Sequence, residues 1–225
     1  MSEWWTYRPQ DLLMFSPDTY YRLFELYNAA IWPAQIIALA AGVVILALLV
    51  RRPPWAGRAV AALLAAAWVF VAWAYFWERY ATINLAAPYY AWGFAAQAVL
   101  LMVVGAILGR LTFGERGTDL GKAGCGLFAV ALILSPLLGL LAGRGWAQLE
   151  AFGVAPDPTV IGTFGVLAAA DRMRWELLVI PALWALITGA TLWTMRSPDA
   201  LVTPAAALFA VAVAVLRIFR SREDR

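Results

Sequence analysis

The chain has 225 residues, of which 64% are hydrophobic and only 14% are charged, and its mean hydropathy is +0.75. Soluble domains are about half apolar and about one quarter charged. This composition therefore excludes a water-soluble globular protein and predicts a protein embedded in a lipid bilayer. The formal charge of +3 indicates little as a total, and no polar stretch is long enough to fold as a separate soluble domain.

The sequence contains no histidine and one cysteine, Cys125. Histidine is the commonest general base and metal ligand, and a lone cysteine forms neither an internal disulfide nor a cysteine-based metal site. The only lysine, Lys122, lies beside an expected membrane boundary, which argues against a retinal Schiff base deep in the bundle. We therefore expect no metal and no cofactor.

Residues 1–27 are aromatic and mixed in polarity, which is typical of a segment at the outer membrane interface. Ser16 followed by Pro17 predicts the start of a helix, with Ser16 as its N-cap. We expect this helix to continue to Val50 as one helix that is kinked at Trp32-Pro33.

Seven segments are candidates for membrane spans, which need about 20 apolar residues each. In chain order they are Asn28–Val50, Gly57–Phe76, Tyr89–Gly109, Gly121–Ala142, Pro158–Ala170, Trp175–Met195 and Ala200–Ile218. The fifth would extend over only about 20 Å, so it is either a thin span or a re-entrant segment.

The distribution of positive charges favours seven spans over six, because cytoplasmic loops are enriched in Lys and Arg. With the N-terminus outside, seven spans place twelve of the 17 Lys and Arg residues on the cytoplasmic side. Without the fifth span, Arg172, Arg174 and the arginine-rich tail would lie outside. The sequence therefore predicts an all-α bundle of seven spans over residues 28–218 in a bacterial inner membrane, with a charged cytoplasmic tail at 219–225.

Glycines spaced four residues apart occur at Gly105/Gly109 and Gly139/Gly143. Small residues at this spacing let helix backbones approach closely in a membrane. The pattern favours tight packing within the chain, and a homo-oligomer interface is the alternative.

Asp157 precedes Pro158 and Thr159, and we expect it to cap the short fifth helix. This region is then either a capped surface turn or the border of an outward-facing pocket. Gln35 and Gln97 either line that pocket or form hydrogen bonds between the first and third spans. The residues expected to line the pocket are Asn28, Trp32, Gln35, Asn84, Tyr89, Trp92, Gln97, Asp157, Thr159 and Thr163.

Several motifs resemble those of a family of uncharacterised bacterial multi-pass membrane proteins. They are Phe15-Ser16-Pro17, Trp32-Pro33-Ala34-Gln35, Pro136-Leu137-Leu138-Gly139 and Phe152-Gly153 followed by Pro156-Asp157-Pro158-Thr159. Members of that family often carry a Gly-His pair and a Cys between prolines, where this chain has Gly143-Arg144-Gly145 and Asp157. The resemblance implies the multi-pass architecture and no particular activity.

Two functions fit these features. The first is binding or transport of a small neutral or lipophilic solute through an outward-facing pocket, and the alternative is an accessory or scaffolding subunit of a larger membrane complex. We do not expect an enzyme, because the sequence offers no paired-carboxylate site and no nucleophile–base pair. The expected partners are the lipid bilayer and either a second copy or other membrane subunits, and not nucleic acid.

Overall fold

The computed structural model describes residues 15–114 and 119–223. Residues 1–14 of the expected interfacial segment lie outside this part, as do Arg116 and Arg225, two of the twelve positive residues expected on the cytoplasmic side. No strand occurs in the described ranges, which confirms the all-α class there. The elements are α1 (Pro17–Ala30), α2 (Ala34–Arg51), α3 (Ala56–Phe70), η3 (Val71–Trp77), η4 (Tyr80–Thr82), α4 (Ala87–Leu100), η5 (Leu101–Ile107), α5 (Asp119–Ala129), η6 (Val130–Leu134), α6 (Ser135–Leu141), η7 (Trp146–Gln148), α7 (Pro156–Ala169), α8 (Trp175–Thr194) and α9 (Val202–Glu223).

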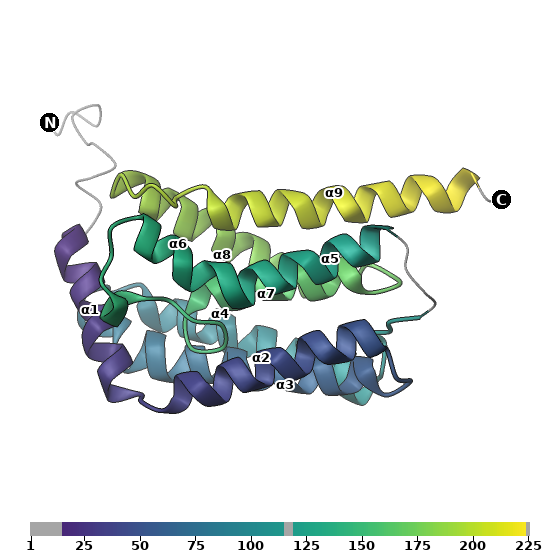
Figure 1. Ribbon diagram of the computed structural model, residues 1–225, viewed down its shortest axis with the longest axis horizontal. Helices are drawn as coiled ribbons and strands as arrows, with labels where there is room; N and C mark the ends of the chain where they lie inside the picture. Colours follow the sequence, from purple (N-terminus) through teal and green to yellow (C-terminus); the bar gives the residue numbers. More distant parts are fainter. Residues whose placement is uncertain (1–14, 115–118, 224–225) are drawn as a thin grey trace, which may run out of the picture.

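The helices from α2 to α9 run back and forth along one long axis (Figure 1). Three of the long segments contain a wider π-helical stretch. The stretches η3 and η5 follow α3 and α4, and η6 lies between α5 and α6. Five segments are long and apolar enough to cross a membrane: Ala34–Arg51, Ala56–Thr82, Ala87–Ile107, Asp119–Leu141 and Trp175–Thr194. The apolar part of α9, Val202–Arg217, is shorter, and α7 has only 14 residues.

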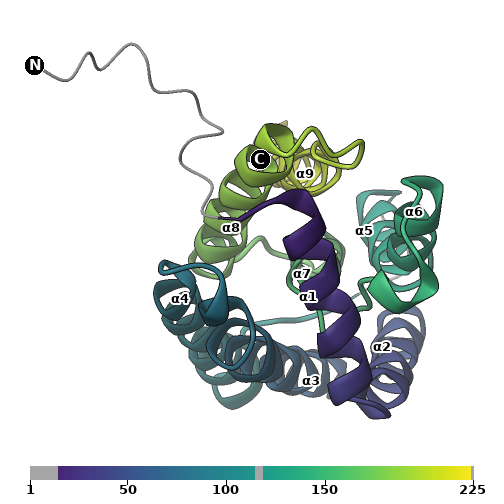
Figure 2. The ribbon, with the colours of Figure 1, turned by 90° about the vertical axis from the view of Figure 1, so that its left-hand side faces the viewer.

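The expected single helix from Pro17 to Val50 is wrong, because the chain breaks at residues 31–33 into α1 and α2. The break falls at the predicted kink, and α1 then lies across one end of the bundle rather than along it (Figure 2). The N-cap prediction is confirmed, since Ser16 Oγ accepts a hydrogen bond from the Thr19 amide at 3.2 Å. We call this end of the bundle, formed by α1 with residues 78–86, 142–155 and 195–201, the α1 end.

The opposite end is formed by residues 51–58, 108–114 and 170–174 together with the start of α5, and we call it the basic end. Its loops are joined to one another: Arg174 Nε donates to the Arg110 carbonyl at 2.9 Å, and the Gly114 amide donates to the Asp171 carboxylate at 2.6 Å. Basic residues collect here, namely Arg51, Arg52, Arg58, Arg110, Lys122, Arg172 and Arg174. Basic residues are thus more numerous here than at the α1 end, which has Arg22, Arg79, Arg144 and Arg196.

Helix α7 occupies the centre of the bundle, and every one of its residues is buried. Figure 2 shows it enclosed by the surrounding helices. It packs most closely on α5, where the Gly165 Cα position faces the Phe128 backbone and Gly124 faces Ala169. A helix of 14 residues is about 21 Å long, which is shorter than a bilayer core, and its neighbours shield it from the surroundings. The expectation of a capped surface turn at its start is therefore wrong.

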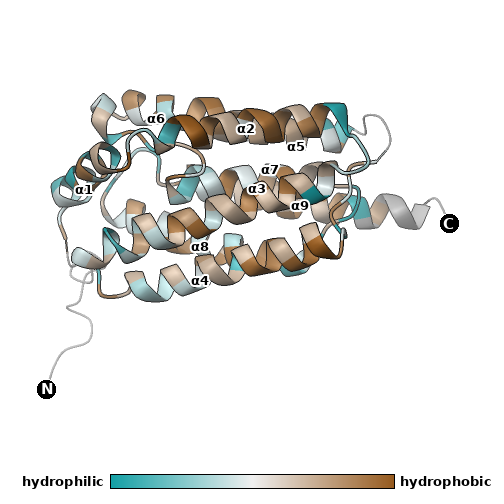
Figure 3. Ribbon diagram, turned by 90° about the horizontal axis from the view of Figure 1, so that it is seen from below, coloured by the Kyte–Doolittle hydropathy of each residue, from teal (hydrophilic) through white to brown (hydrophobic). Residues whose placement is uncertain are grey.

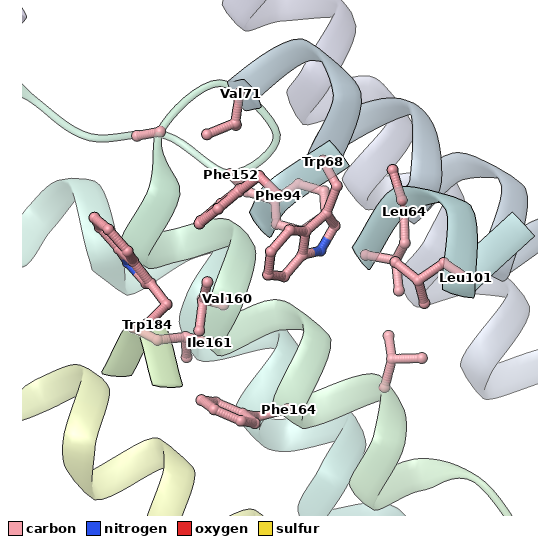
Figure 4. Close-up of a cluster of buried hydrophobic side chains, with 14 of the residues drawn as sticks. Leu64, Trp68, Val71, Phe94, Leu101, Phe152, Val160, Ile161, Phe164 and Trp184 are labelled. Atoms are coloured by element: carbon pink, nitrogen blue, oxygen red, sulfur yellow. The ribbon is translucent and has the colours of Figure 1, made fainter. Parts of the chain in front are cut away.

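A cluster of aromatic side chains packs where α7 faces α3, α4 and α8 (Figure 4). The rings of Trp68 and Phe94 are 4.2 Å apart, and Phe94 meets Trp184 edge-on at 5.4 Å. The indole N–H of Trp68 donates to Thr163 Oγ1 at 2.9 Å, which satisfies both buried polar groups. Aromatic packing therefore holds α7 against three of the long helices.

The sides of the bundle expose large apolar side chains, while polar residues concentrate at its two ends (Figure 3). Examples are Ile37 at 70%, Leu186 at 68% and Leu208 at 71% exposure. Soluble monomers rarely expose apolar surface on this scale, so the lateral surface is suited to lipid. Within the bundle, Gly105 lies directly against Ala61 of α3, which accounts for this glycine by packing inside the chain.

Candidate functional site

An apolar groove of about 390 Å³ lies between α2 and α3 near the α1 end. Its walls are Ala34, Ala38 and Ala41 of α2 with Ala66, Ala67 and Phe70 of α3, and residues 152–154 contribute its floor. Short alanine side chains leave the space between the two helices unfilled, and the volume falls in the range of small-molecule sites. The groove has the dimensions and the polarity of a site for an apolar molecule.

The floor of this groove belongs to the loop between η7 and α7, which inserts into the bundle at Phe152. The Phe152 ring is fully buried and meets Phe128 edge-on at 5.2 Å. Gly42 and Gly162 make room for this ring, because a Cβ at either position would approach it to 3.0 Å or less. The Phe152 ring thus lies between α2 and α7.

Hydrogen bonds to α1 hold the same loop in place. Tyr27 Oη donates to the Val154 carbonyl at 2.7 Å, and Asn28 Nδ2 donates to the carbonyls of Ala147 and Leu149 at 2.9 Å each. The Gly153 amide donates to Thr159 Oγ1 at 2.9 Å. Two predicted site residues, Asn28 and Thr159, therefore support the groove floor without lining the groove.

A buried polar cluster lies beside this loop at the α1 end. Arg144 donates to Glu150 Oε1 at 2.8 Å and also pairs with Asp199. Its guanidinium stacks over the Tyr21 ring, 4.7 Å from the centroid. Ser197 Oγ donates to Asp199 Oδ1 at 2.5 Å and lies 2.8 Å from Tyr21 Oη. One cation therefore joins the loop before α7, the turn before α9 and helix α1.

Asp157 adjoins this cluster from the first turn of α7. The expectation that it caps the helix is wrong, because Ala155 is the N-cap and α7 begins at Pro156. Its carboxylate instead accepts from Trp184 Nε1 at 2.7 Å and from Thr188 Oγ1 at 2.9 Å, both on α8. Asp157 therefore bonds to α8, where two donors satisfy both of its oxygens.

Between Asp157 and the Arg144 ion pairs lies a small cavity of about 30 Å³. Besides Arg144 and the three carboxylates, Ser135 and Thr203 contribute polar groups to its lining. Ser135 Oγ and Arg144 Nε are buried and have no hydrogen-bond partner among the described residues. The described residues contain no group of three His, Cys, Asp or Glu side chains arranged to hold a metal ion.

The two glutamines form hydrogen bonds, but not with each other. Gln35 Nε2 donates to the Asn28 carbonyl at 2.8 Å and ties α2 to α1. Gln97 is fully buried, and its Nε2 donates to the Leu177 carbonyl at 2.9 Å. The expected bond between the first and third spans is therefore wrong, because α8 rather than α2 faces Gln97. Thr163 accepts a hydrogen bond from the Trp68 indole, so it also joins elements of the core.

The remaining predicted residues lie apart from the groove. Trp32 is 66% and Tyr89 is 77% exposed, and Asn84 Oδ1 accepts from the Ala86 amide at the start of α4. Trp92 meets Trp77 edge-on at 6.2 Å and lines a second, more open hollow of about 380 Å³. The structure therefore does not bring the ten predicted residues together in one pocket.

Sequence reasoning missed Arg144, Glu150 and Asp199 as a group, since each resembles an ordinary charge in an outer loop. Their only shared signal is that all three lie in loops that the seven-span topology places on the outer side. It also missed the alanines of the groove, because alanine in a membrane segment is indistinguishable from ordinary helix packing.

The chain belongs to the family of unknown function DUF6064, which matches residues 17–225. This match confirms the resemblance to an uncharacterised family. Neither a curated protein nor a solved structure matches the chain.

Proposed function

We propose that this chain is an integral membrane protein that binds a lipophilic molecule with a slender hydrocarbon chain in the groove between α2 and α3. The carrying observation is the groove itself, about 390 Å³ in volume and walled by alanines on a face that is otherwise suited to lipid. A hydrocarbon chain that fills this hollow gains close packing contacts with its walls and leaves no polar group unpaired.

The proposal includes seven membrane segments with the N-terminus outside and residence in a bacterial inner membrane. Two observations support it: the back-and-forth course of α2 to α9, and the collection of arginines at the basic end. The positive-inside rule assigns that end to the cytoplasm. Helix α7 then crosses as an internal helix, since neighbouring helices rather than lipid surround it.

The shape of the groove favours a slender chain over a bulky ring system. Ala38 and Ala67 stand on opposite walls, and Gly153 between them approaches Ala38 so closely that a Cβ would lie 2.9 Å from the Ala38 Cβ. The second hollow, beside Trp73 and Trp92, also has Glu78 in its lining. The α2–α3 groove is thus the more uniformly apolar of the two.

Photolabelling with a diazirine-bearing fatty acid in lipid nanodiscs tests the proposal. We expect labelled peptides from residues 34–41 and 63–70, and a loss of this labelling in Ala38→Trp and Ala67→Trp, where the indole fills the groove. Ala40→Trp is the matched control, because Ala40 is exposed on the same helix and does not line the groove. Labelling spread evenly around α2, or confined to the Trp73–Trp92 hollow, would contradict the proposal.

Orientation has its own test in a variant whose single cysteine is replaced by alanine. Leu85 at the α1 end and Trp55 at the basic end are both exposed, so a cysteine at either position is accessible to a reagent on its side. We expect a membrane-impermeant maleimide to label Leu85→Cys and not Trp55→Cys in intact cells. The reverse result would invert the orientation.

A stable partner chain in near-stoichiometric yield after mild extraction would favour the accessory-subunit alternative.

A further inference from the structure

The buried cluster at the start of α7 contains more negative than positive charge. Glu150, Asp157 and Asp199 converge on one cavity, and among the described residues Arg144 is the only cationic side chain that lines it. The side chains of Arg144 and Glu150 are 6% and 9% exposed. Burying an uncompensated carboxylate is costly, and the usual relief is to bind a proton.

The three carboxyl groups differ in the hydrogen bonds that they accept. Asp157 accepts from Trp184 and Thr188, one donor for each oxygen. Asp199 accepts from Ser197 and is paired with Arg144. Donors of this kind stabilise the ionised form. Among the described residues, Glu150 accepts a hydrogen bond from Arg144 alone, through Oε1, and its carboxylate faces the charge of Asp157.

The cavity supplies a place through which that proton can exchange. A volume of about 30 Å³ admits a water molecule, which requires roughly 10–15 Å³ and two or more polar partners. Arg144 Nε and Ser135 Oγ line the cavity without a partner among the described residues. Together they offer a donor and a hydroxyl to water, within the same lining as the carboxylates.

We propose that this cavity is a proton-binding site in which Glu150 is the protonated group at neutral pH, balanced by Arg144 against the carboxylates of Asp157 and Asp199. This proposal does not rest on a ligand in the apolar groove. Burial and the neighbouring Asp157 charge raise the pKa of Glu150 to about 8, against the lowering effect of Arg144. Tyr20 and Tyr21 from α1 and Tyr75 from η3 are the other titratable side chains that interact with Glu150.

Infrared spectroscopy of the full chain in nanodiscs, titrated from about pH 6 to about pH 10, tests the site through the C=O stretch of a protonated carboxyl. Carboxyl-¹³C labelling of glutamate separates Glu150 from the two aspartates. We expect a glutamate band that disappears with a midpoint near pH 8, is absent in Glu150→Gln and persists in Glu78→Gln. Glu78 is the matched control, an exposed glutamate at the same end.

Asp199→Asn keeps the proposal testable if Glu150→Gln does not fold. With the competing carboxylate neutral, Arg144 pairs more fully with Glu150, so the midpoint of the glutamate band is expected to move to lower pH. An unchanged midpoint would overturn the assignment. So would a band that survives in Glu150→Gln, a band that follows aspartate labelling, or the absence of any such band over the whole titration.

Discussion

Asp157 and Arg217 lie against opposite ends of α7. The Asp157 carboxylate occupies the first turn, and the Arg217 guanidinium donates to the carbonyl of Ala168 at 2.5 Å and to that of Ala170. Each charge matches the sign of the helix dipole at its end. A short helix that is buried on all sides cannot rely on water for its terminal groups, and these two side chains provide part of that compensation.

Removing Arg217 should therefore weaken the packing of α7 at the basic end. We expect Arg217→Met to lower the free energy of unfolding by about 1 to 2 kcal/mol, because two carbonyls lose a charged donor, and Arg217→Lys to restore part of it. Reversible unfolding in mixed micelles measures this difference. Arg172→Met, at an exposed arginine of the same end, is the control, and an equal loss there would contradict the role of Arg217.

Replacing the carboxylate at the other end of α7 should cost more. Asp157→Leu leaves the buried donors of Trp184 and Thr188 without an acceptor, at about 1 to 3 kcal/mol for each unsatisfied group. The same unfolding measurement should show that Asp119→Asn, at an exposed acidic residue, has little effect. Combining Asp157→Leu with Trp184→Phe should recover part of the loss, and a fully additive loss would argue against this bond.

Close backbone packing between α5 and α7 predicts opposite effects for two glycines of the same helix. A Cβ at Gly124 would lie 2.4 Å from the Ala169 amide nitrogen, whereas Gly126 faces open space. Gly124→Ala should force the helices apart and destabilise the protein by about 1 to 3 kcal/mol. Gly126→Ala should be neutral or stabilising by up to about 1 kcal/mol, since alanine favours helix. Thermal unfolding of both variants measures these effects. A Gly126→Ala variant less stable than Gly124→Ala would contradict the prediction.

The raised pKa of Glu150 predicts how its contribution to stability depends on pH. The folded protein holds this proton more tightly than the unfolded chain, whose glutamate has an ordinary pKa of 4.5. Stability from this group is therefore fully present below pH 4.5 and is lost as the pH rises through about 8. Melting temperatures across this range should fall less steeply in Glu150→Gln, and parallel curves for the variant and the parent would contradict the shift.

Composition and hydropathy predicted a membrane protein and an all-α architecture, because apolar runs of about 20 residues suit membrane helices and not the alternating strands of a barrel. The sequence also predicted the start of α1 at Ser16-Pro17 and the position of the chain break near Trp32-Pro33, because both depend on local interactions. A cap and a proline act through their own backbone, so sequence neighbours suffice to predict them.

Tertiary structure decided what surrounds α7. Its length could not tell a thin span from an internal helix, since that depends on which neighbours cover it. Asp157 was expected to act on its own helix, yet the packing of α8 supplies better donors. Arg144, Glu150 and Asp199 are separated by up to 55 residues, and their meeting depends on the turns that return the chain to the α1 end. The groove likewise exists because Phe152 enters between helices that are distant in sequence. Periodicity and local propensity carry no information about such long-range contacts. The physical properties of the apolar groove and of the buried polar cluster arise from these contacts.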